Sequence, residues 1–184
     1  MADLNSLSLY RSFCDGLDER WSDFLSKRAE HFAQSIRRGA ALEKNTEGII
    51  DEFLMVVLRW EQAQIEYQVG KADISLVSNH ITRMIIETKR PGLLSNPKIF
   101  KKALEQAYGY AHKRRVTNVA VSDGIVFYAE STIDNVPVGR AQVSLTQRSV
   151  PDPEMLFLIS PDGIYRDVHV NIRRPCPDVF PRAR

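Results

Sequence analysis

The period with which apolar residues recur changes near Tyr67, and this change limits the folds that the chain can adopt. Before it, apolar side chains recur every three or four residues, as on one side of a helix. Between about Leu4 and Arg38 they are Leu7, Tyr10, Phe13, Leu17, Trp21, Phe24 and Leu25. After it, short runs of apolar residues resemble strands. The pattern predicts helices first and then a sheet.

Two helices are expected before the change of period. The first covers about Leu4 to Arg38, with Gly16 as a weak point and Arg37-Arg38-Gly39 as its end. The second runs from about Glu43 to Gln64, and its apolar face consists of Ile49, Ile50, Phe53, Leu54, Val57 and Leu58. Trp21 and Trp60 belong to apolar stripes, so both are expected in the core.

Turn residues divide the rest of the chain into short elements. The expected strands are Tyr67–Val77, Arg83–Lys89, Val116–Ser122, Ile125–Glu130 and Ala141–Leu145, with turns at Ser78-Asn79-His80 and Asp123-Gly124. One helix is expected at Pro97–Arg114, and a helical turn or strand at Glu154–Ser160. The tail from Asn171 has an extended or disordered composition. This order favours the α/β (α+β) class, a mixed central sheet flanked by helices.

Composition indicates an ordinary globular chain of 184 residues, about one domain with short extensions. No signal peptide is recognisable, and the longest apolar run, Phe53 to Leu58, is too short to cross a bilayer. Cys14 and Cys176 lack metal-like spacing and are typical of free thiols in a reducing cytoplasm. We therefore expect a cytoplasmic protein without a membrane partner. The net charge of +2 does not by itself indicate a nucleic-acid partner.

Three charged residues stand out within the expected strands. Glu87 and Lys89 are two positions apart, so a strand directs them to the same face, and Asp73 on the preceding strand can reach that face. Charged residues that alternate along a strand usually mark only a solvated surface. Here Ile85 and Ile86 indicate an internal strand, where paired charges are rare without a function.

Two carboxylates and an ammonium group are suited to phosphodiester hydrolysis. Carboxylate oxygens bind Mg²⁺, which polarises a phosphate and lowers the pKa of bound water. A lysine can orient or deprotonate that water, or neutralise charge that builds on phosphorus. Asp73 and Glu87 are therefore candidate metal ligands, with the carbonyl of Thr88 as a third, and Lys89 is a candidate catalytic residue. Mn²⁺ is a possible substitute for Mg²⁺.

The arrangement resembles the PD-(D/E)XK nuclease superfamily, in the version found at the N-terminus of type I restriction enzyme motor subunits. Besides Asp73 and Glu87-Thr88-Lys89, Glu43-Lys44-Asn45-Thr46 is similar to the family's E-x-x-T segment. Gln106-Ala107-Tyr108-Gly109-Tyr110 resembles its Q-x-x-x-Y helix, and residues 117–128 resemble its closing strand pair. The family's proline before the aspartate is replaced by Ala72.

The resemblance implies a restriction-endonuclease-like sheet in residues 41–170, after an N-terminal helical extension (1–40) and before a basic tail (171–184). It implies a metal-dependent DNA endonuclease of restriction-modification type, in which Glu43 or Glu47 approaches the metal and Gln106 joins the catalytic residues. No G-x-x-x-x-G-K-[ST] motif for an ATP-driven motor is present. Either the nuclease acts alone, or a motor or specificity subunit lies outside this sequence.

Basic residues flank the Q-x-x-x-Y segment of the helix expected at 97–114. Those that could follow a DNA backbone, together with one tyrosine that could stack on a base, are Lys101, Lys102, Tyr110, Lys113, Arg114 and Arg115. The simpler interpretation for each is a solvated helix face, or core packing for the tyrosine.

Three further hypotheses follow from the sequence. One is an inactive nuclease-fold module that binds nucleic acid or assists assembly; another is an RNA endonuclease. The third is a homodimer, in which the long N-terminal helix supplies the contact and two sites cut both strands.

Overall fold

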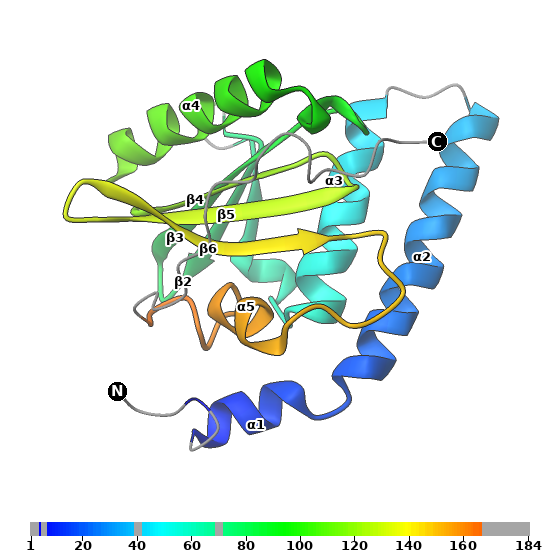
Figure 1. Cartoon of the computed structure of the whole chain (residues 1–184), viewed down its shortest axis with the longest axis horizontal. Coiled ribbons are helices and arrows are strands. Elements are labelled where there is room, and N and C mark those ends of the chain that lie inside the picture. The colour runs from blue at the N-terminus through cyan, green and yellow to red at the C-terminus, as the bar shows by residue number, and fades with distance from the viewer. Residues whose placement is uncertain (1–3, 5–6, 39–41, 69–71, 167–184) are drawn as a thin grey trace.

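The structure is a computed structural model that describes residues 4, 7–38, 42–68 and 72–166 (Figure 1). The expected tail from residue 171, with Cys176, lies outside the described residues. The helices are α1 (Ser8–Cys14), α2 (Leu17–Arg38), α3 (Leu42–Glu52), α4 (Pro97–Arg114) and α5 (Pro153–Leu158). The strands are β1 (Ile65–Tyr67), β2 (Ile74–Ser78), β3 (Ile81–Thr88), β4 (Asn118–Ser122), β5 (Val126–Ile133) and β6 (Val136–Ser144).

The six strands form one mixed sheet in the order β1-β2-β3-β4-β5-β6. Neighbouring strands are antiparallel except β3 and β4, which are parallel and are joined through α4. Such a parallel connection requires a crossover, and here the helix supplies it. The predicted class, a mixed sheet flanked by helices, is confirmed.

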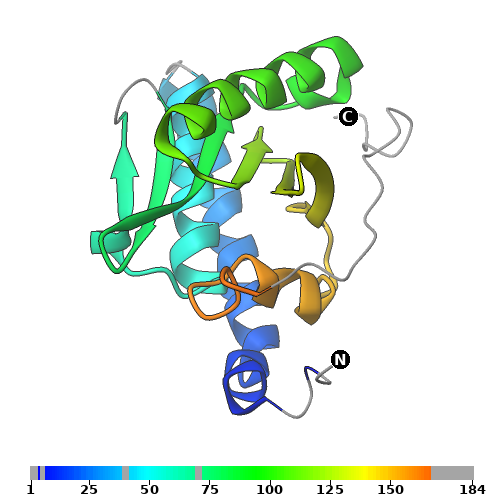
Figure 2. The ribbon, with the colours of Figure 1, turned by 90° about the vertical axis from the view of Figure 1, so that its left-hand side faces the viewer.

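The two faces of the sheet are covered by different helices (Figures 1 and 2). Met84 and Ile86 of β3 belong to the apolar cluster that includes side chains of α1, α2 and α3. Ile85, between them, belongs to a second cluster with apolar residues of α4. Because β3 is paired on both edges and covered on both faces, it is an internal strand, as Ile85 and Ile86 indicated.

Helix α4 has the bounds that the sequence predicts, because its end signals are strong. The side chain of Asn96 accepts hydrogen bonds from the backbone N–H groups of Lys98 and Ile99, and Pro97 occupies the first turn. At the other end, Arg115 adopts a left-handed conformation with φ of 57°. The basic residues of the last turn lie at the negative end of the helix dipole.

The first expected helix is two helices. Gly16 has φ of +66° and separates α1 from α2, so the predicted continuous helix from Leu4 to Arg38 is wrong at the position named as weak. The apolar stripe of the two helices packs into the same cluster as the sheet, through Phe13, Leu17, Trp21 and Phe24. The N-terminal helices therefore share the core of the sheet domain.

The second expected helix ends before Gln64. After α3 the chain makes one wider helical turn, Phe53–Val57, and Arg59 then adopts φ of 65°. This exit buries Trp60, whose indole N–H donates to the carbonyl of Ile159 at 3.0 Å. The tertiary contact of Trp60 outweighs the local helical pattern.

The predicted strand Tyr67–Val77 is also wrong as one element, because β1 ends at Tyr67 and β2 begins only at Ile74. The hairpin of β2 and β3 is confirmed, and Asn79 and His80 form its turn with positive φ values. The last element, α5, is helical. Among the described residues, no helix is long and apolar enough to span a membrane.

We predict that the N-terminal helices contribute directly to the stability of the sheet domain. Leu17 is 4% exposed within the shared cluster, whereas Leu9 on α1 is 48% exposed. Leu17→Ala should lower the free energy of unfolding by about 2–5 kcal/mol, because it leaves a cavity. Leu9→Ala should change it by less than about 0.5 kcal/mol. Urea unfolding followed by circular dichroism measures both, and equal small effects would mean that the helices do not stabilise the sheet.

Candidate active site

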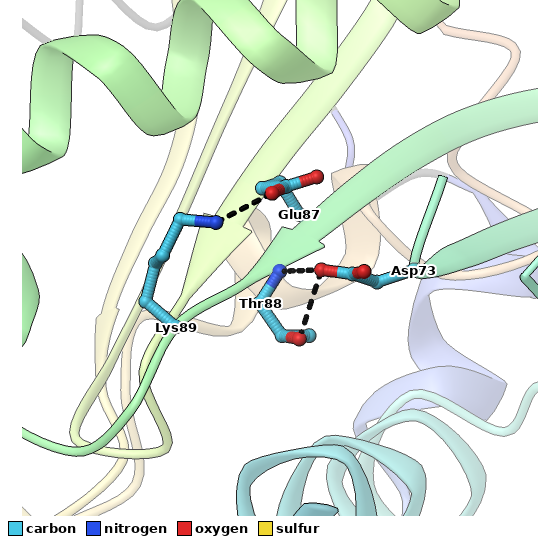
Figure 3. A network of polar contacts seen from close by, with 4 residues as sticks. All are labelled: Asp73, Glu87, Thr88 and Lys89. Atoms are coloured by element: carbon cyan, nitrogen blue, oxygen red, sulfur yellow. Dashed lines mark hydrogen bonds and ion pairs between the residues drawn. The ribbon is translucent and has the colours of Figure 1, made fainter. Parts of the chain in front are cut away.

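Glu87 and Lys89 lie at the end of β3, on the face that α4 covers. Alternation along the strand directs Glu87 to the same side as Ile85. Only 6% of the Glu87 side chain and 18% of the Lys89 side chain are exposed. The Nζ of Lys89 lies 2.5 Å from Oε1 of Glu87, and this ion pair is drawn in Figure 3. The strand end thus carries a charge pair that is largely removed from water.

Asp73 joins this group through Thr88, the residue between Glu87 and Lys89. The register pairs Ile74 with Ile86, so Asp73 lies beside the end of β3. Its Oδ2 accepts a hydrogen bond from the backbone N–H of Thr88 at 2.7 Å and another from the Thr88 hydroxyl at 3.0 Å (Figure 3). All three predicted residues therefore contact or belong to the segment 87–89. The side chain of Thr88 alternates with that of Glu87 and points to the opposite face of β3, so the contact with the Thr88 hydroxyl directs Asp73 away from the face on which Glu87 meets Lys89.

The first turns of α3 are attached to the same segment. The hydroxyl of Thr46 donates to the carbonyl of Lys89 at 2.9 Å. Thr46 was part of the predicted E-x-x-T segment, but no role for its side chain followed from the sequence. The side chain of Glu43 lies outside the described residues. Glu47 is half-buried. Burial is the main cause of the raised pKa of Tyr67, and the charge of Glu47 adds to it, which places Glu47 near β1.

Asp123 is a supporting residue that sequence reasoning recognised only as part of a turn. Its Oδ1 accepts hydrogen bonds from the N–H groups of Ile125 and Val126, and its Oδ2 accepts one from Leu94 at 3.2 Å. Burial raises the pKa of Asp123, while these N–H groups act in the opposite direction. The carboxyl group thereby connects the β4–β5 turn with the loop that follows Lys89.

The backbone of Lys89 is held as well. Its N–H donates to the carbonyl of Ser122 at 2.8 Å, which extends the pairing of β3 with β4 by one residue. Together with the hydrogen bond from Thr46, this contact fixes both backbone polar groups of Lys89. The side chain of Lys89 therefore begins from a well-defined position.

The residues predicted on and after α4 are distributed along the helix. Gln106 is half-buried, and no described contact joins it to Glu87 or Lys89. Tyr110 packs against the apolar cluster under α4, in agreement with the core alternative. Arg114 donates to the hydroxyl of Ser75 at 2.9 Å. The side chains of Lys101, Lys102, Lys113 and Arg115 are exposed.

The donor set suits a hard divalent cation. Asp73 and Glu87 supply carboxylate oxygens. The carbonyl of Thr88 lies between the Thr88 N–H that Asp73 contacts and Lys89, which Glu87 contacts. Within the described part of the chain, no group of three His, Cys, Asp or Glu residues is placed to hold a metal. Mg²⁺ usually keeps several waters and needs only one or two carboxylates. In this structure Asp73 contacts Thr88 and Glu87 contacts Lys89, so binding of one ion by both carboxylates would require these side chains to turn toward each other.

The ion pair between Glu87 and Lys89 should be energetically coupled in the metal-free protein. We predict a coupling free energy of about 0.5–3 kcal/mol in a double-mutant cycle of Glu87→Gln and Lys89→Met, because each partner alone would be buried without its counter-charge. The measurement is urea unfolding in the presence of a chelator.

Lys101 and Glu105 provide the matched control for this cycle. Their charged groups are 3.8 Å apart on the exposed side of α4, where coupling should stay below about 0.5 kcal/mol. A Glu87–Lys89 coupling no larger than that of the control pair would contradict the geometry of the site.

Comparisons with models of protein families, with curated proteins and with solved structures found no match to this chain.

Proposed function

We propose that this protein is a metal-dependent endonuclease that hydrolyses DNA phosphodiester bonds. The observation that carries the proposal is the end of β3, where a buried Glu87 contacts Lys89 and Asp73 contacts the intervening Thr88. Burial of a carboxylate and an ammonium group is costly, and their pairing often does no more than offset that cost, so a largely buried ion pair is seldom explained by stability alone. Two carboxylates beside a lysine are suited to phosphodiester hydrolysis.

The order of the elements supports a restriction-endonuclease-like fold. A helix that contacts the site segment precedes an antiparallel hairpin, and a crossover helix then leads to a strand parallel to the second strand of the hairpin. The site lies on the strands of this hairpin and next to the parallel pair. The resemblance of the Asp73, Glu87 and Lys89 pattern to the PD-(D/E)XK superfamily agrees with that arrangement.

In the proposed site, Asp73, Glu87 and the carbonyl of Thr88 would hold Mg²⁺ or Mn²⁺, and Glu43 or Glu47 would be a further ligand. The bound cation would polarise the phosphate and lower the pKa of a coordinated water. Glu87 contacts Lys89 through Oε1, so a shift of this oxygen toward a cation would release the ammonium group. Lys89 could then donate to a phosphate oxygen or orient the attacking water.

The exposed basic residues provide a surface for the DNA backbone. Lys101, Lys102, Lys113 and Arg115 lie on or directly after α4, the helix over the face to which Glu87 points. A net charge of +2 gives little long-range attraction, so binding would depend on these local contacts and on salt concentration. Arg114 and Tyr110, which pack against the domain, would have a smaller part in DNA contact.

We predict that purified protein cuts DNA in Mg²⁺ or Mn²⁺ and not in chelator. Asp73→Ala, Glu87→Ala and Lys89→Ala should each lower the cleavage rate at least about 100-fold, because each removes a metal ligand or the ammonium group. The assay follows plasmid, linear and single-stranded DNA on gels, beside an RNA substrate. Circular dichroism checks that each variant is folded.

Glu19→Ala is the matched control, because Glu19 is an exposed carboxylate on α2 outside the site. It should cut at the wild-type rate. If wild-type protein binds DNA but no divalent metal produces cleavage, the nuclease proposal is wrong and a binding module takes its place. Cleavage of RNA in preference to DNA would change the substrate class.

A further inference from the structure

A polar pocket opens at the opposite end of β4 from the candidate active site. It has a volume of about 280 Å³, and its lining includes Thr117, Asn118, Ser131 and Thr132 of the sheet end. Arg140 of β6 and Arg166 of the loop after α5 complete the polar part of its wall. Asn118 and Val121, which pairs with Glu87, are separated by roughly 10 Å along the strand. The pocket is therefore distinct from the Asp73–Glu87–Lys89 group.

Arg140 gives this pocket a fixed positive charge. The residue is only 2% exposed. Its Nε donates to the carbonyl of Leu158 at 2.7 Å, and its Nη1 donates to the hydroxyl of Ser131 at 3.0 Å. Its Nη2 donates to three further carbonyls, those of Gly163, Ile164 and Arg166. These bonds hold the guanidinium group rigidly at the pocket wall.

The loop that carries Arg166 is closely packed, so the pocket is formed before any ligand arrives. A side chain on Gly163 would approach the carbonyl oxygen of Phe157 to 1.8 Å, which leaves no space for one. The guanidinium group of Arg166 lies over the Phe157 ring, 5.8 Å from its centre. The hydroxyl of Tyr165 donates a hydrogen bond to the hydroxyl of Ser78 at 2.6 Å.

Two buried guanidinium N–H groups in or near the pocket lack a hydrogen-bond acceptor. Among the described residues, the Nε atoms of Arg166 and of Arg83 are buried without a hydrogen-bond partner. Arg83 adjoins the pocket, since its guanidinium group lies 4.3 Å from the centre of the Tyr165 ring. A buried donor without an acceptor costs free energy. Arg166 also lines the pocket, so an anion bound there would lie beside this guanidinium group.

The residues that line the pocket favour a negatively charged ligand. None of the described residues that line the pocket is an Asp or a Glu, whereas two are arginines and three carry hydroxyl groups on Ser or Thr. Arginine and hydroxyl donors together recognise phosphate oxygens. The pocket volume of about 280 Å³ is just below the roughly 300–1,000 Å³ typical of ligand pockets, which suits a small ligand rather than a polymer.

We propose that this pocket binds a phosphate group, as the free anion or as a phosphate monoester of nucleotide size. The site is independent of the proposed metal site, because its donors lie at the other end of β4. Binding should therefore occur in the presence of a chelator and should not require nuclease activity.

The test is isothermal titration calorimetry of the full chain with inorganic phosphate and with a deoxynucleoside 5′-monophosphate, in chelator and at constant ionic strength. We expect saturable binding of at least one of the two. A preference for inorganic phosphate would identify a free-anion site, and a preference for the nucleotide would identify a monoester site. Absence of saturable binding of both would overturn the proposal.

Variants separate this site from general attraction to positive charge. Arg166→Gln should weaken binding at least tenfold, and Thr132→Val, which keeps the charge and nearly the shape, should weaken it about threefold. Arg148→Gln removes the same charge from an exposed residue outside the pocket and should leave binding unchanged. Equal weakening by Arg148→Gln and Arg166→Gln would overturn the proposal, and Thr132→Val decides the matter if Arg166→Gln does not fold.

Discussion

The ion pair between Glu87 and Lys89 organises the candidate active site. A carboxylate with 6% of its side chain exposed would be costly without a nearby cation, and Lys89 supplies one at 2.5 Å. Several contacts hold Lys89 and the loop that follows it in this position. Ser122 and Thr46 hold its backbone, and Asp123 holds the loop that follows. Residues of β4, α3 and the β4–β5 turn thus all support one charge pair.

Asp73 belongs to the same group because of where β2 begins. The ladder between β2 and β3 includes Ile74 and Ile86, and beyond this pair the carboxylate of Asp73 accepts the backbone N–H of Thr88. At Thr88, the side chain of Asp73 therefore takes the place of β2 as the hydrogen-bond partner of the β3 backbone. This substitution places a carboxylate at the sheet end while it satisfies a backbone donor that would otherwise need another acceptor.

Elements with strong local signals were predictable from the sequence, and elements set by tertiary contacts were not. Helix α4 has the expected bounds because of Asn96 and Pro97, and the hairpin turn at Asn79 and His80 was also found. The helix after α3 ends early because Trp60 is buried against Ile159. In the site, a period of two predicts that Glu87 and Lys89 share a face. The link of Asp73 to Thr88 and the contacts of Asp123 depend on register and on a distant loop, which local patterns do not encode.

Anomalous X-ray diffraction from crystals that contain Mn²⁺ would test the proposed metal site, because it locates the cation without reference to activity. We expect one anomalous peak bounded by oxygens of Asp73 and Glu87 and by the carbonyl of Thr88, with Nζ of Lys89 moved away from Oε1 of Glu87. Crystals that show the Glu87–Lys89 contact intact and no peak beside these carboxylates, at a Mn²⁺ concentration that supports cleavage, would contradict it.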